Sequence, residues 1–146
     1  MNRKQFIKQC VFACASMASL GAAMSSCVPV KNITANIEDS DLVLSLSSFE
    51  FEHKGERRYR KFVLVHNDRI QFPLCVTRLN DKDFSAVLMR CPHQGAELQV
   101  FGDKLQCPAH GSEFDNRGAV MSPPADSNLR AFPVIIKNNQ LKISLK

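Results

Sequence analysis

Two short segments, each with one cysteine and one histidine between turn-forming residues, constrain this chain most. They are Cys91-Pro92-His93-Gln94-Gly95 and Cys107-Pro108-Ala109-His110-Gly111, and 13 residues separate His93 from Cys107. Proline and glycine let a backbone turn tightly, so the thiol and the imidazole of each segment can point the same way. We therefore expect two paired loops that supply four metal ligands, namely Cys91, His93, Cys107 and His110.

Two metal centres fit this ligand set. One is a zinc ion with two cysteines and two histidines, and the other is a [2Fe-2S] cluster with two cysteines on one iron and two histidines on the other. A zinc finger groups its ligands by type and places the histidines on a helix, whereas this chain repeats the order Cys, His on two loops. The mixed order favours the cluster, and a structural zinc module stays the remote alternative.

The hydrophobic pattern after residue 40 predicts an all-β domain. Leu42, Leu44 and Leu46 alternate with other residues, as in a half-buried strand, and Phe49 and Phe51 continue the alternation after a break. Turn signals separate further expected strands, at 59–66, 74–79, 84–90, 104–107 and 133–137. Asn138-Asn139 predicts a two-residue hairpin. We expect a tether at 28–40, then one domain at 41–146, a sandwich or partial barrel of short antiparallel strands, with its metal-binding part at about 90–125.

The paired loops resemble those of the Rieske iron-sulfur family, and the resemblance covers about residues 59 to 145. The family's boxes, C-x-H and C-x-x-H, are matched by the four candidate ligands. Gly111-Ser112-Glu113-Phe114-Asp115 continues the second box, Arg117-Gly118 follows, and Ser122-Pro123-Pro124 matches the proline loop that covers the cluster. The resemblance implies a Rieske-type fold, a [2Fe-2S] cofactor, and a cluster covered by Pro123 and Pro124.

The departures from the family pattern indicate which kind of Rieske protein this is. Members from quinol-oxidising complexes carry one more cysteine in each box, joined as a disulfide, but those places hold Ala96 and Ala109 here. The resemblance is therefore to the disulfide-free, ferredoxin-like type. Ser112 stands where high-potential members have a hydroxyl that donates to a bridging sulfide, and Phe114 stands where they often have a tyrosine. With one donor kept and one lost, we expect a reduction potential between the two classes.

Residues 1–27 have the pattern of an export signal. Arg3, Lys4 and Lys8 precede the uncharged run from Cys10 to Met24, like the basic and apolar regions of a signal peptide. The 15 residues of that run span roughly 22 Å as a helix, less than the ~30 Å hydrocarbon core, so cleavage is favoured over an uncleaved anchor. Asn2 to Lys8 resembles the twin-arginine export motif, with Lys4 in place of the second arginine.

The end of this segment, Leu20 to Cys27, resembles a bacterial lipoprotein signal, in which small residues precede a cysteine that receives a lipid. Met24 stands where an aliphatic residue is usual. The alternative is an ordinary signal whose cleavage leaves a free thiol at Cys27. A lipidated Cys27 would tether an exported protein to the periplasmic face of a bacterial membrane.

Charge gives little support for a nucleic-acid partner. Residues 1–26 hold three of the 19 basic residues and none of the 14 acidic ones, so the formal charge without them falls from +5 to +2. The remaining basic stretch, Arg57 to Lys61, alternates along an expected strand and is typical of a solvated face. We expect no nucleic acid to bind.

A cluster near the surface with two histidine ligands can pass one electron to a redox protein partner. The chain has no second constellation for substrate chemistry, such as two histidines with a carboxylate for a mononuclear iron. We therefore expect an electron carrier, tethered to the membrane, without a catalytic site of its own. The alternative is the small Rieske subunit of a larger periplasmic oxidoreductase, similar to that of arsenite oxidase.

Overall fold

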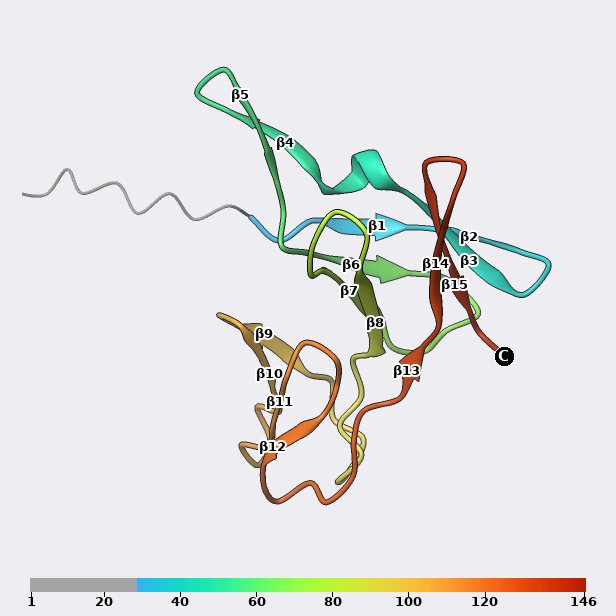
Figure 1. Ribbon diagram of the computed structural model, residues 1–146. Helices are drawn as coiled ribbons and strands as arrows, with labels where there is room; N and C mark the ends of the chain where they lie inside the picture. The colour runs from blue at the N-terminus through green and yellow to red at the C-terminus, as the bar shows by residue number, and fades with distance from the viewer. Residues whose placement is uncertain (1–28) are drawn as a thin grey trace, which may run out of the picture.

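Two β-sheets that face each other enclose the main core of the protein. The computed structural model describes residues 29–146, which are almost entirely β-structure (Figure 1). The five-stranded sheet has the order β1 (Asn32–Thr34), β6 (Phe62–His66), β7 (Leu74–Arg78), β8 (Phe84–Leu88) and β13 (Ala131–Phe132). The facing four-stranded sheet has the order β14 (Val134–Lys137), β15 (Gln140–Ser144), β3 (Asp41–Ser45) and β2 (Asn36–Glu38).

Alternation along the strands builds this core. In β3 the buried residues are Leu42 and Leu44, and in β15, its antiparallel neighbour, they are Leu141 and Ile143. The strands β14 and β15 form the hairpin expected from Asn138-Asn139, and both asparagines have positive φ values, 51° and 62°. The predicted all-β architecture of short, mainly antiparallel strands is thus confirmed.

A smaller sheet carries the metal-binding part of the chain. It has the order β12 (Val120–Ser122), β11 (Glu113–Phe114), β10 (Lys104–Gln106) and β9 (Gln99–Phe101), and all its neighbouring strands are antiparallel. Its inward residues form a second core together with residues of β7 and β8. The buried members of this second core are Cys75, Val87, Met89, Cys91, Leu98, Leu105, Cys107, Phe114, Ala125 and Leu129.

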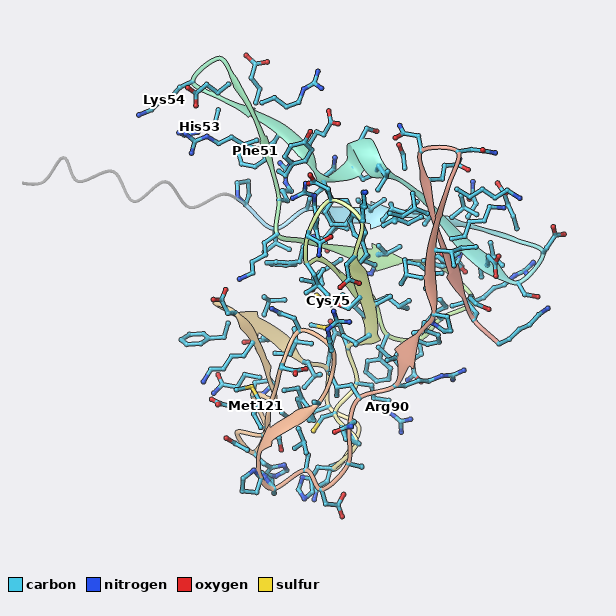
Figure 2. All side chains as sticks on the ribbon, in the orientation of Figure 1. Phe51, His53, Lys54, Cys75, Arg90 and Met121 are labelled. Atoms are coloured by element: carbon cyan, nitrogen blue, oxygen red, sulfur yellow. The ribbon has the colours of Figure 1, made fainter. Side chains whose placement is uncertain are left out.

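The central strands β7 and β8 lie between the two cores and contribute side chains to both. Leu74 and Val76 of β7 lie in the main core, while Cys75, which points to the other face, lies in the second core. Figure 2 shows Cys75 near the middle of the molecule. The continuous apolar run in β7 is explained by this position, because a strand covered on both faces needs no polar side.

The alternation breaks between Leu46 and Phe49, as expected. A short 3-10 helix, η1 (Leu46–Phe49), follows β3, and the side chain of Ser45 accepts a hydrogen bond from the backbone N–H of Ser47 at its start. β4 (Glu50–His53) and β5 (Glu56–Tyr59) then form a separate hairpin, which projects from the end of the molecule opposite the two ligand loops (Figure 1). The strand expected at 59–66 is likewise divided, since β5 ends at Tyr59 and β6 begins at Phe62.

The tether expected at 28–40 is wrong for most of its length. Residues 32–34 pair in parallel with β6, and residues 36–38 pair with β3, so both segments belong to the sheets. Ile33 and Ile37 pack against the main core. Each strand has only three residues, with one inward side chain, which is too short for alternation to be visible in the sequence.

Within residues 29–146, no helix is long and apolar enough to cross a membrane. The export signal at 1–27 and the lipid site at Cys27 lie outside the described residues.

We expect Phe49 to be a main contributor to stability. Its side chain is 1% exposed, and its ring packs edge-to-face against Phe84 with centroids 5.3 Å apart. Phe49→Ala should lower the free energy of unfolding by about 3–5 kcal/mol, measured by denaturant titration. Phe101, which is 64% exposed, is the matched control, and Phe101→Ala should change it by less than about 0.5 kcal/mol. Equal effects of the two variants would contradict this packing.

Candidate metal centre

The two ligand loops share one pattern of backbone hydrogen bonds. The N–H of Cys91 donates to the carbonyl of Ala96, and the N–H of Gly95 donates to the carbonyl of Cys91, both at 2.8 Å. In the second loop, Cys107 donates to Ser112 at 2.8 Å, and Gly111 donates to the carbonyl of Cys107 at 2.9 Å. Both glycines have positive φ, 77° and 82°, which this tight turn requires. The loops are thus two copies of one turn, with the histidine shifted by one position.

Strand alternation decides which way the cysteines point. Val87, Met89 and Cys91 are spaced by two residues and all lie in the second core, and the same holds for Leu105 and Cys107. The alternation therefore continues from β8 and β10 into the loops. Backbone pairing holds the base of each loop. Arg90 pairs with Glu97 at the base of the first loop, and β10 pairs with β11 at the base of the second.

The loops bring all four predicted ligands to one end of the molecule. The cysteines Cys91 and Cys107 are free and buried, with 1% and 2% exposure. His93 and His110 are exposed, and their rings lie side by side with centroids 5.0 Å apart and planes at 89°. Thiols thus lie inside and imidazoles lie outside, and each pair comes from both loops.

This arrangement fits a [2Fe-2S] cluster. Two thiolates suit an inner iron and two imidazoles suit an outer one. Among residues 29–146, no three His, Cys, Asp or Glu side chains gather around one metal-sized point. A binuclear cluster does not need such a point, because each of its irons takes only two protein side chains.

Ser112 links the second loop to the segment that contains the two prolines. It is fully buried, and its Oγ accepts a hydrogen bond from the backbone N–H of Ala125 at 3.0 Å. Since that bond uses an oxygen lone pair, the hydroxyl hydrogen stays free to donate to a cluster sulfur. Pro123 and Pro124 directly precede Ala125 and are exposed, so this bond ties the predicted covering segment to the second loop.

Phe114 lies at the other predicted tuning position. It is fully buried in the second core and belongs to β11. A phenylalanine there supplies packing but no hydrogen-bond donor, so the side chain occupies the predicted place without the polar group that a tyrosine would add.

Cys75 differs from the ligand cysteines in its surroundings. It is 1% exposed, and its Sγ lies 3.7 Å from the hydroxyl of Thr77. Burial raises its pKa to about 11, against a partial opposing effect of Thr77. Cys75 is therefore a neutral packing residue at physiological pH.

The polar residues after the second loop belong to the family motif, but the sequence assigned them no role in the site. Asp115 Oδ1 accepts the backbone N–H groups of Arg117 and Ala119, both at 2.8 Å, which fixes the turn that leads into β12. The sequence Asp115-Asn116-Arg117-Gly118 is an identifiable turn signal. The turn belongs to the metal-binding part because it connects β11, the strand after the second ligand loop, to its partner β12.

The fold and the donor set define an iron-sulfur protein, and comparisons with known proteins give its family. The family model of the Rieske [2Fe-2S] domain matches residues 49–133, more than half of the chain. The chain belongs to the Rieske [2Fe-2S] domain family, and its cofactor is a [2Fe-2S] cluster that passes electrons.

Solved structures with the same fold include two of which the match covers most of the length. The plasma membrane Rieske protein PetC3 from Synechocystis PCC 6803 is 25% identical with a TM-score of 0.51, covering 57% of this chain and 86% of that one. The ferredoxin of Sphingomonas yanoikuyae B1 is 22% identical with a TM-score of 0.51, covering 71% of this chain and 96% of that one. The second likeness concerns the fold alone.

The curated relatives are longer proteins. The oxygenase component of dicamba O-demethylase from Stenotrophomonas maltophilia is 41% identical over 73 residues, 43% of this chain and 22% of that protein. Methylxanthine N1-demethylase NdmA from Pseudomonas putida is 41% identical over 58 residues, 38% of this chain and 16% of that protein. The chain therefore spans less than a quarter of the length of these relatives.

We expect the reduction potential to depend on the two tuning positions. Ser112→Ala removes a donor that stabilises the more negative, reduced cluster, and it should lower the midpoint potential by roughly 40–90 mV, the equivalent of one hydrogen bond of about 1–2 kcal/mol. Phe114→Tyr adds a donor and should raise the potential. Redox titration followed by visible spectroscopy measures both shifts.

The matched control is Ser85→Ala. Ser85 is also a buried serine, but its hydroxyl donates to the carbonyl of Asn116 at 2.6 Å, so its loss should leave the potential unchanged. A wild-type potential as high as that of the quinol-oxidising Rieske proteins, which have both hydroxyls, would refute the intermediate value.

Proposed function

We propose that this protein is a one-electron carrier whose cluster is held by Cys91 and Cys107 on an inner iron and by His93 and His110 on an outer iron. The observation that carries the proposal is the pair of exposed imidazoles, 5.0 Å apart, above two buried thiols. When bound, the cluster supplies a single oxidising or reducing equivalent. The imidazoles lie at the surface, where a redox partner can approach them.

The polypeptide has two tasks in this function. The buried cysteines hold the cluster against the apolar second core, which keeps water from the sulfur atoms. The two closed turns fix the ligands before an electron arrives, which keeps structural rearrangement small. Charged side chains flank the loops, because the Arg90 guanidinium lies against Gly95 and the exposed Asp126 directly follows the residues 122–125.

We further propose that the protein is exported and tethered to the periplasmic face of a membrane through lipid on Cys27. The basic and apolar regions at 1–24 and the small residues before Cys27 support this. The structure starts its first strand at Asn32, so only a few residues separate Cys27 from the folded domain. A tethered domain would therefore stay close to the membrane surface.

A second candidate function is electron delivery within a larger oxidoreductase. It is favoured by the 41% identity to an oxygenase component over the matched 73 residues. In this form the chain would be a small subunit, as in the arsenite-oxidase-like arrangement, and the substrate site would lie on another chain. Stable co-purification with a chain that carries a catalytic centre would support this candidate over a freely diffusing carrier.

Ligand substitutions test the proposed centre. Cys91→Ser, Cys107→Ser, His93→Ala and His110→Ala should each abolish the cluster, because each removes one of four protein ligands. The wild type should contain two irons and two sulfides per chain, and its reduced form should give a Rieske-type EPR spectrum.

Two controls use residues of the same type at other places. Cys75→Ala and His53→Ala should keep the full iron content, because Cys75 packs the core and His53 lies on the β4–β5 hairpin, far from the ligand loops (Figure 2). A colourless wild-type protein with one zinc per chain would reject the redox function and leave the zinc module.

The tether has its own test. Expressed in a bacterium as the full chain, the protein should be found in the membrane fraction, and Cys27→Ser should move it to the soluble periplasmic fraction, because the lipid is lost. Cys14→Ser, in the expected signal, should leave the distribution unchanged. A Cys27→Ser protein that stays in the membrane would indicate an uncleaved anchor instead.

A further inference from the structure

Hydrogen bonds hold the segment that contains the two prolines at three points. Residues 123–129, here called the covering loop, contain no strand and connect β12 to the segment before β13. One contact holds the loop from the cluster side, namely the bond from Ala125 N–H to Ser112 Oγ. Two further contacts hold its returning end, at Asn128 and Leu129.

Leu129 packs tightly against Gly118. Its N–H donates to the carbonyl of Gly118 at 2.8 Å, and its side chain is buried in the second core. Gly118 has φ +87°, and a Cβ there would lie 3.0 Å from Leu129 Cβ and 3.1 Å from Val87 Cγ1. The backbone of residue 118 and the side chain of Leu129 are therefore in tight contact.

Asn128 closes the base of the covering loop. Its Oδ1 accepts the backbone N–H of Val120, the first residue of β12, at 3.0 Å. The bond joins the strand that enters the loop to the residue that leaves it, eight positions later along the chain. It thereby sets the spacing between the two ends of the loop, and so the distance from the prolines to Ser112.

We propose that Asn128 is a positioning residue for the cluster: it holds the covering loop closed, which keeps the Ala125 amide on Ser112 and the two prolines over the cluster. This inference rests on the proposed cluster site. Its hydrogen bond is to the backbone of Val120, so Asn128 acts through the backbone of the loop. Its loss leaves Leu129 in place but lets residues 123–127 swing away from the second ligand loop.

The experiment compares three variants of the full chain loaded with its cluster. Asn128→Ala removes the acceptor, Asn128→Asp keeps an oxygen at the same place, and Asn80→Ala is the matched control. Asn80 Oδ1 accepts the N–H of Lys82 at 2.9 Å in another exposed loop, so its loss removes a bond of the same kind elsewhere. The measurements are amide hydrogen exchange of the peptide spanning 119–129 and the rate at which a chelator bleaches the cluster absorbance.

In Asn128→Ala the peptide should exchange about five-fold faster and the cluster should bleach faster by a similar factor, as expected for the loss of one ordinary hydrogen bond. Asn128→Asp should restore both rates, and Asn80→Ala should change neither. Thermal unfolding of Asn128→Ala should remain a single cooperative transition. A folded Asn128→Ala chain that loses its cluster during purification is the extreme form of the expected result.

The inference is overturned if Asn128→Ala leaves both rates at the wild-type values, if Asn80→Ala raises them equally, or if Asn128→Asp does not restore them. Should Asn128→Ala not fold, Asn128→Ser, which shortens the side chain so that it cannot reach Val120, takes its place with the same expected rates. Failure of the cluster site itself is distinct, because then the wild-type chain would hold no cluster to bleach.

Discussion

The metal centre depends on one constraint: two thiols must be buried while two imidazoles, only two or three residues further on, reach solvent. Strand alternation buries the thiols, because Cys91 and Cys107 each lie two residues after a buried side chain, Met89 or Leu105, and so point to the same inward face. The closed turn exposes the imidazoles, because it reverses the chain directly after each cysteine. The rest of the small sheet serves to place these two turns side by side.

The inward residues of the alternating strands are buried in the second core. One face of β7 and β8 belongs to this core and the other face belongs to the main core, so the same two strands close the main core and support the metal centre. Cys75 marks this double use, since it points to the second core from a strand whose neighbours Leu74 and Val76 point to the main core. Apart from the Thr77 hydroxyl at 3.7 Å, the surroundings of Cys75 are apolar, which suits a small, neutral thiol.

Local patterns predicted the ligands and most long strands, because the evidence for them lies within a few residues. The Cys-Pro-His and Cys-Pro-Ala-His segments, the alternation at Leu42 to Leu46 and the Asn138-Asn139 turn are of this kind. The strands β1 and β2 were missed because each places a single isoleucine inward, and β1 pairs in parallel with a strand about 30 positions away. Asn128 was missed for a similar reason, since its partner is set by the path of the covering loop.

The division into two cores places the predicted ligand cysteines away from the main core. The main core has its own set of buried Leu, Val, Phe and Ile side chains and contains neither Cys91 nor Cys107. The second core has ten buried residues, among them these two predicted ligands and Ala125 and Leu129 of the covering loop. Loss of a bound metal centre would therefore disturb the second core first, because its predicted cysteine ligands pack there.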